Sequence, residues 1–226
     1  MRRILIVAAI SLMGVVVYAQ DYHYNDDTTY EEVVISEAEY HDYNKDDIKT
    51  LSGGRYHSGG FGAVSFKSSE FRDKTLVMGG VRGGWIINRT LAIGFEGYGV
   101  IPTAEFDNLV PGRNAVLLGG YGGMFLEPII FSNHLVHVTF PLTGGAGWLG
   151  FHDDWEENYY NDEEIIDEDV FWYVEPGVAL ELNVSKHFRL NCGVSKRFAE
   201  DLKLLGTGAN EFDKLNYFLT LKFGKF

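Results

Sequence analysis

The stretch "VFWYVEPGVALELNVSKHFRLNCGVSKRF", residues 170–198, decides the fold. Its side chains alternate between two faces, because successive residues of an extended strand point to opposite sides. In the first run one face is apolar from Val170 to Val184, whereas the other face carries Glu175 and Glu181. The alternation resumes after "SKH", and so short a link predicts a β-hairpin.

The same period of two recurs along the chain and predicts eight strands. The links "NR", "SNH" and "SKH" are short, whereas those through 102–113, 151–169 and 200–213 are longer, and "SSEFRD" follows the first strand. Short turns at one end and longer loops at the other are typical of a transmembrane β-barrel. We therefore expect an all-β, eight-stranded antiparallel up-and-down transmembrane β-barrel. The expected strands are 54–67, 74–88, 91–101, 114–131, 135–150, 170–184, 188–199 and 214–226.

Charged residues in four of these strands share one register, which we assign to the lumen. A basic residue facing lipid at the bilayer midplane costs about 2–4 kcal/mol, so charges at strand centres should point inward. A barrel of this size is just wide enough for side chains to fill it. We therefore expect a paired polar network in place of an open channel. The inward charges are Arg82, Glu96, Glu175, Glu181, Arg189 and Arg197.

Residues 1–19 have the pattern of a secretory signal peptide. Arg2 and Arg3 precede an uncharged stretch at 4–17, which is shorter than the roughly 20 residues that a spanning helix needs. Small or branched residues follow, and they predict cleavage between Ala19 and Gln20. The single cysteine, Cys192, allows neither lipidation near that cut nor an intramolecular disulfide.

Acidic residues are concentrated in two segments of a chain whose formal net charge is −13. The first lies in residues 20–53, which we expect to form a flexible N-terminal arm before a barrel at 54–226. The sequence leaves open whether this arm stays free or docks on the barrel. An acidic chain lacks the basic surface that nucleic acid requires, so we exclude nucleic acid as a partner.

The second acidic segment is the predicted loop 151–169. Dense carboxylates can bind Ca²⁺, but the spacing and central glycine of an EF-hand are absent. We therefore expect a solvated acidic loop and no cofactor, with a calcium site as the alternative. Such a loop could also meet lipopolysaccharide through bridging divalent cations. The candidate ligands are Asp153, Asp154, Glu156, Asp162, Glu163 and Asp167.

Several features together resemble the small outer-membrane β-barrel proteins of Bacteroidetes-type bacteria, whose barrels are eight-stranded and OmpA/OmpX-like. These features are Gln20 at the cut, glycine- and aromatic-rich strands, the hairpin "EPGVALELNVSKHFRL" and the ending "LTLKFGKF". The resemblance implies an outer-membrane location and insertion by the outer-membrane assembly machinery. Phe223 and Phe226 are similar to that machinery's C-terminal recognition signal. Phe226 is out of register with Phe223, so it requires a bulge near Gly224 or a place beyond the last strand pair.

No motif supports catalysis. Ser132 and His134 share a turn, and neighbours such as His57 and Ser58 point to opposite faces of a strand. We therefore expect a non-catalytic protein with a structural or surface-interaction role, in contact with outer-membrane lipid and lipopolysaccharide. Two alternatives stay open, namely a porin-like channel for small solutes and a soluble lipocalin-like barrel whose apolar face points inward.

Overall fold

The computed structural model describes residues 57–102, 105–110, 113–153, 165–208 and 210–226. Every regular element in this part of the chain is a β-strand. Over the same ranges, no helix is long and apolar enough to cross a membrane. The strands are β1 (Ser58–Phe71), β2 (Lys74–Ile87), β3 (Leu91–Ile101), β4 (Glu105–Val110), β5 (Arg113–Ile130), β6 (Val136–Thr139), β7 (Leu142–Asp153), β8 (Ile165–Asn183), β9 (Phe188–Lys196), β10 (Phe198–Ala199) and β11 (Leu215–Lys225).

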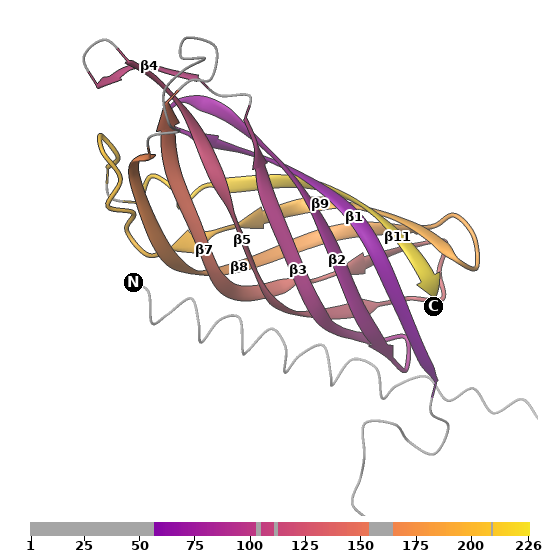
Figure 1. Ribbon diagram of the computed structural model, residues 1–226. Helices are drawn as coiled ribbons and strands as arrows, with labels where there is room; N and C mark the ends of the chain where they lie inside the picture. The colour runs from indigo at the N-terminus through magenta and orange to yellow at the C-terminus, as the bar shows by residue number, and fades with distance from the viewer. Residues whose placement is uncertain (1–56, 103–104, 111–112, 154–164, 209) are drawn as a thin grey trace, which may run out of the picture. The chain divides into compact units, whose positions relative to one another are not determined.

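These strands form the wall of a closed antiparallel barrel with eight positions around it (Figure 1). Three positions are each made of two consecutive strands in line, namely β3 with β4, β6 with β7, and β9 with β10. The first strand, β1, pairs with both β2 and β11, so the wall has no open edge there. The predicted all-β, eight-stranded up-and-down barrel is confirmed.

The two ends of the barrel differ in their connections. Residues 88–90, 131–135 and 184–187 make the turns of one end, which we call the short-turn end. The other end, which we call the loop end, carries the connections after β1, β4, β7 and β10. The C-terminal residue lies at the short-turn end (Figure 1).

The first connection of the loop end is shorter than the sequence suggested. We expected "SSEFRD" to be a link, but β1 continues through most of it and pairs Phe71 with Lys74. Only Arg72 and Asp73 remain in the turn, at φ values of 48° and 60°. Two successive residues with positive φ make the tight turn whose twist suits a hairpin. The expected link is therefore wrong, because residues 68–71 continue the two-residue alternation of the strand, with Ser69 and Phe71 buried.

The acidic connection of the loop end is also shorter than predicted. The expected loop 151–169 is strand at both of its ends, since β7 runs to Asp153 and β8 begins at Ile165. Strand β8 is 19 residues long, and its first residues pair with β7 across an irregularity between Phe151 and His152. Residues 154–164, with much of the acidic charge, lie outside the described part of the chain.

One predicted strand, 135–150, is broken in two at Phe140 and Pro141. Proline has no N–H to donate to the ladder, so a regular strand cannot continue through it. The break is bridged by irregular bonds: Phe140 N donates to Pro128 O at 3.0 Å, and Gly177 N donates to Pro141 O at 2.8 Å. The wall therefore stays closed although the ladder is interrupted.

Facing glycines allow the wall to pack closely between β5 and β7. Gly123 pairs with Gly145, and both lie on the lumen side. A Cβ atom at Gly145 would lie 2.0 Å from Gly122 O and 2.6 Å from Gly123 Cα. Such distances cannot be relieved by a side-chain rotation, because the contacting atoms belong to the backbone.

We predict that Gly145→Ala destabilises the barrel by about 1–3 kcal/mol, the usual cost of inserting atoms into a packed site. The measurement is equilibrium unfolding in urea, followed by tryptophan fluorescence of the detergent-solubilised protein. Gly97→Ala is the matched control, since a Cβ atom there meets nothing within 4 Å. Equal unfolding midpoints for the two variants would show that the close approach is not a constraint.

Candidate functional site

The outer face of the barrel is apolar. Large side chains on it are left open to the surroundings, and Phe95 and Trp172 are 66% and 68% exposed. A contiguous apolar surface of this kind marks a contact with lipid or protein. Other outward residues that are more than a third exposed include Phe66, Val81, Trp85, Ile93, Met124, Val170, Val174, Leu180, Leu219 and Phe223.

Three tryptophans lie toward the two ends of this apolar face. Trp85 lies near the short-turn end, where its Nε1 donates to Ser58 Oγ at 2.6 Å. Trp148 and Trp172 lie in the part of the wall nearer the loop end, and Trp148 Nε1 donates to Glu168 Oε2 at 2.9 Å. Indole rings with one apolar face and one hydrogen-bonded edge suit the boundary between lipid and water.

The lumen holds one continuous chain of oppositely charged side chains. It starts at Arg189, passes through Glu181, Lys222, Glu127, Arg82, Glu96 and Lys67, and ends at Glu175, and every one of these residues is at most 7% exposed. Lys222 Nζ lies 2.6 Å from Glu127 Oε1 and 2.5 Å from Glu181 Oε2. Arg82 lies 2.7 Å from Glu96 and 3.1 Å from Glu127.

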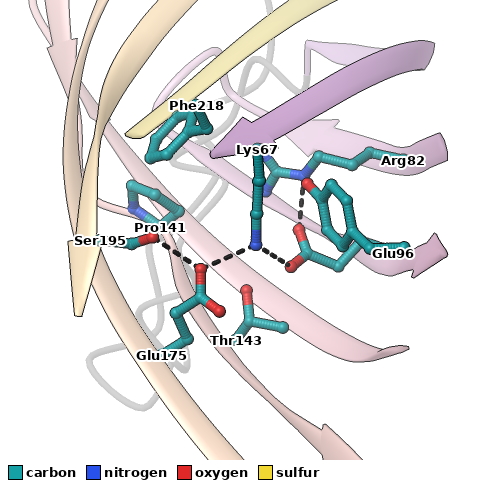
Figure 2. Close-up of a pocket in the computed structure, with 9 residues that line it drawn as sticks. Lys67, Arg82, Glu96, Pro141, Thr143, Glu175, Ser195 and Phe218 are labelled. Carbon is teal, nitrogen blue, oxygen red and sulfur yellow. Dashed lines mark hydrogen bonds and ion pairs between the residues drawn. The ribbon is translucent and has the colours of Figure 1, made fainter. Parts of the chain in front are cut away.

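The loop-end part of this chain surrounds a small pocket (Figure 2). Lys67 Nζ lies between two carboxylates, 2.7 Å from Glu175 Oε1 and 3.5 Å from Glu96 Oε1. Ser195 Oγ also donates to Glu175, at 2.6 Å, and the ring of Tyr98 lies 3.9 Å from the Lys67 ammonium. The pocket has space for about one water molecule.

The structure brings five of the six predicted lumen residues into this network, namely Arg82, Glu96, Glu175, Glu181 and Arg189. The sixth, Arg197, is also fully buried and inward. Its guanidinium carbon, however, lies 3.4 Å from the centroid of the Phe212 ring, and among the described residues no carboxylate pairs with it. Arg197 is therefore part of the lumen but not of the ion-paired chain.

Sequence reasoning missed Lys67, Glu127, Lys222 and His137, which complete the network. His137 Nε2 lies 3.1 Å from Glu181 Oε1. The signal for them was present, because each shares the inward register of a strand whose outward residues are apolar. They lie on β1, β5, β6 and β11, whereas the charges predicted to face the lumen lie on or next to β2, β3, β8 and β9.

Apolar side chains close the lumen on both sides of the network. Phe61, Ile86, Phe125 and Ile129 form a buried cluster at the short-turn end, with Phe226 packed against it. A larger cluster fills the half nearer the loop end. Its buried aromatic side chains are Phe71, Tyr98, Phe106, Tyr121, Phe151, Phe171, Tyr173 and Phe212.

Residues 200–208 and 210–214, between β10 and β11, cap this larger cluster, and we call them the cap. Leu202, Leu204 and Phe212 of the cap are each at most 6% exposed. Two carboxylates of β8 hold the backbone of the cap: Lys203 N donates to Asp169 Oδ2 at 2.7 Å, and Leu205 N donates to Asp167 Oδ2 at 2.6 Å. Asp167 and Asp169, which the sequence placed in the predicted acidic loop, thus stabilise the cap.

The calcium candidates are only partly visible. Asp154, Glu156, Asp162 and Glu163 lie outside the described residues, as does the side chain of Asp153. Asp167 binds the cap backbone, as described above. In the part of the chain that the structure describes, no three His, Cys, Asp or Glu side chains cluster so as to hold a metal ion. The calcium site stays a prediction.

The sequence allowed Phe226 either to follow a bulge near Gly224 or to lie beyond the last strand pair, and the structure shows the second arrangement. Strand β11 pairs regularly with β1 up to Lys225, without a bulge at Gly224. Phe226 follows the last pair and turns inward, so that its ring centroid lies 6.4 Å from that of Phe61 and 4.1 Å from the Arg189 guanidinium. Phe223 lies on the outer face, stacked on Phe188. The cut at Ala19 and Gln20 lies outside the described residues.

We predict that Lys222→Met destabilises the barrel by about 3–5 kcal/mol, because it leaves Glu127 and Glu181 with less compensating charge. Urea unfolding in detergent measures the loss. The double variant Lys222→Met with Glu127→Gln should recover part of that stability, since it removes one of the two carboxylates. Lys196→Met is the control for a lysine outside the network. An unfolding midpoint for Lys222→Met equal to that of Lys196→Met would contradict the role of the network.

Neither a protein-family model nor a curated protein matches the sequence. Among solved structures, the chain is similar to Ail, the attachment invasion locus protein of Yersinia pestis, in complex with the heparin analogue sucrose octasulfate. That likeness has a TM-score of 0.44 and 12% identity, and it covers 74% of this chain and 97% of the other. The chain is also similar to Neisserial surface protein A, with a TM-score of 0.45, 10% identity and coverage of 75% and 97%. The outer membrane protein OprG from Pseudomonas aeruginosa matches at a TM-score of 0.33 and 13% identity, with coverage of 75% and 93%. The fold assignment rests on the strand pairing described above.

Proposed function

We propose that this protein is a non-catalytic outer-membrane barrel with a structural or surface-interaction role. The observation that carries the proposal is the reversal of polarity across the wall. The outer face exposes side chains such as Phe95 and Trp172, while the inner face buries an ion-paired network of lysines, arginines and glutamates. In a barrel that spans a membrane, lipid takes the place of water against the outer face.

The same polarity weighs against the soluble lipocalin-like alternative. Such a barrel needs an apolar cavity for its ligand and a polar surface toward water. Here the middle of the lumen is charged, and its pocket has space for about one water molecule. The apolar side chains deeper toward each end are packed against one another, as in the pairs Phe71 with Phe106 and Phe171 with Phe212.

The lumen also weighs against a solute channel. A channel needs a continuous water path, whereas the described lumen is filled by an ion-paired layer between two apolar clusters. Opening it would separate several buried charge pairs at once, and breaking one such pair by removing a partner costs about 3–5 kcal/mol. We therefore assign the barrel a lumen closed to solutes and place its contacts with lipid and lipopolysaccharide on its outside.

Lipid is the first partner that this surface implies. The exposed apolar face would contact acyl chains, with indole rings toward its two ends at the headgroup levels. The loop end would face the outside of the cell, because short turns lie on the periplasmic side of such barrels. Lipopolysaccharide would then surround the loop end, and the acidic segment between β7 and β8 would meet its phosphates through divalent cations.

We predict that Phe95→Lys destabilises the barrel in lipid vesicles by about 2–4 kcal/mol, the cost of a lipid-facing lysine near the midplane. Phe95 suits this test because it is exposed at the centre of β3 and lies beside Glu96, which points inward. Urea unfolding of the vesicle-inserted protein gives the difference from Phe95→Leu, which keeps the site apolar. A lysine variant as stable as the leucine variant would show that this face meets water.

Cell fractionation and conductance test the proposal as a whole. The mature protein should need detergent for extraction and should migrate differently on gels before and after heating, because a closed barrel resists unfolding in detergent. Recovery in the soluble periplasm would overturn the outer-membrane location. In planar bilayers we expect no stepwise conductance. Regular single-channel steps would show that the protein is a solute channel and would overturn the structural role.

A further inference from the structure

The buried charges of the lumen do not balance. The described barrel buries five permanent bases (Lys67, Arg82, Arg189, Arg197 and Lys222) but only four carboxylates (Glu96, Glu127, Glu175 and Glu181). Four of the bases are used by the ion-paired chain, which contains all four carboxylates. The fifth base is Arg197, which forms no salt bridge with these carboxylates, although it acts electrostatically on Glu175, and which contacts the cap through Phe212.

The guanidinium of Arg197 is fully buried but only partly satisfied. Its Nε donates to Phe212 O at 3.0 Å, whereas its Nη1 and Nη2 have no hydrogen-bond partner among the described residues. Stacking on the Phe212 ring stabilises the cation but supplies neither a negative charge nor an acceptor. A buried arginine normally has both, because an isolated buried charge is costly.

A second buried donor, the Tyr173 hydroxyl, belongs to a ring that packs against the same side chain as Arg197 does. The Tyr173 hydroxyl forms no hydrogen bond with any described residue. Both groups flank the same ring, that of Tyr121: the Arg197 guanidinium carbon lies 5.1 Å from its centroid, and the Tyr173 centroid lies 4.9 Å from it. The Arg197 guanidinium and the Tyr173 ring, each with a donor that lacks a hydrogen-bond partner, thus lie against one aromatic side chain.

The apolar half of the lumen provides the surroundings for an aromatic group. The Phe212 ring stacks on the Arg197 guanidinium. The centroid of the Phe212 ring lies 5.0 Å from that of Phe171 and 6.1 Å from that of Phe71. It belongs to the cap, which is held in place by hydrogen bonds and apolar contacts and not by pairing with a strand. Among the described rings of this cluster, Phe212 is the one that no strand carries.

We propose that the half of the barrel beneath the cap is a binding site for a small aromatic or otherwise apolar carboxylate. Its carboxylate accepts hydrogen bonds from Arg197 Nη1 and Nη2 and from the Tyr173 hydroxyl, and it supplies the missing negative charge. Its apolar part takes the place of the Phe212 ring against Phe71 and Phe171. In the unliganded protein, Phe212 occupies that place. The site requires only the closed barrel, so it stands independently of the outer-membrane role.

Phenylacetate is a suitable probe, and phenylacetamide is its uncharged match of nearly the same shape. Binding is measured by isothermal titration of the full mature chain in detergent micelles, with empty micelles subtracted. We expect the Phe212→Ala variant to bind phenylacetate about tenfold more tightly than the wild type, because the ring that competes for the site is gone. Phenylacetamide should bind Phe212→Ala about tenfold more weakly than phenylacetate, because it cannot form a charge-assisted hydrogen bond with Arg197.

Substitution of the donors separates this site from a merely apolar cavity. Adding Arg197→Met to Phe212→Ala should weaken phenylacetate binding about tenfold and leave phenylacetamide binding unchanged. If the Arg197→Met variant does not fold, Tyr173→Phe, which removes only a hydroxyl, takes its place in the test. We expect Tyr173→Phe to weaken phenylacetate binding as well, but by a smaller factor. Equal binding of the two probes, or an affinity for phenylacetate that neither donor variant changes, would overturn the proposal. So would the absence of phenylacetate binding to both the wild type and Phe212→Ala.

Discussion

The pairing of charges inside the barrel is the constraint on which the rest of the structure depends. A wall that exposes apolar side chains outward has only its inner face for polar groups, and that inner face is cut off from water. Each buried glutamate therefore has a base from another strand, and Lys67, Arg82 and Lys222 each lie between two glutamates. Lys222 shows the geometry most clearly, because it joins carboxylates of β5 and β8 from its own position on β11. The contacts tie together strands that are not neighbours in the wall, so they define the barrel's cross-section as well as its electrostatics.

Much of this architecture follows from the sequence alone. A period of two decides which residues share a face, and a lipid-facing charge is costly, so the polar register must be the inner one. The eight wall positions follow from the runs, and Glu175 and Glu181 lie inward as their register requires. The places where prediction failed are local. Pro141 interrupts a run that looked continuous, and residues 68–71 extend β1 where a link was expected.

The partners of the inward groups could not be predicted in the same way. Register places a side chain inside but does not say which other strand it meets, since that depends on the tilt and stagger of the whole wall. Arg197 shares the register of Arg189, yet one pairs with Glu181 and the other stacks on Phe212. The acidic segment shows a similar limit. Asp167 and Asp169 belong by composition to a solvated loop, but the cap brings two backbone N–H groups to them.

The inward turn of Phe226 has a consequence for the order of events in assembly. Its ring lies against Phe61 of β1 and the guanidinium of Arg189, contacts that exist only after β1 and β11 have met. A barrel whose first and last strands have not yet met therefore lacks the surroundings that bury this ring. Closing the wall and packing the short-turn end of the lumen are thus a single event, because the residue that completes the apolar cluster there follows directly after the strand that closes the wall.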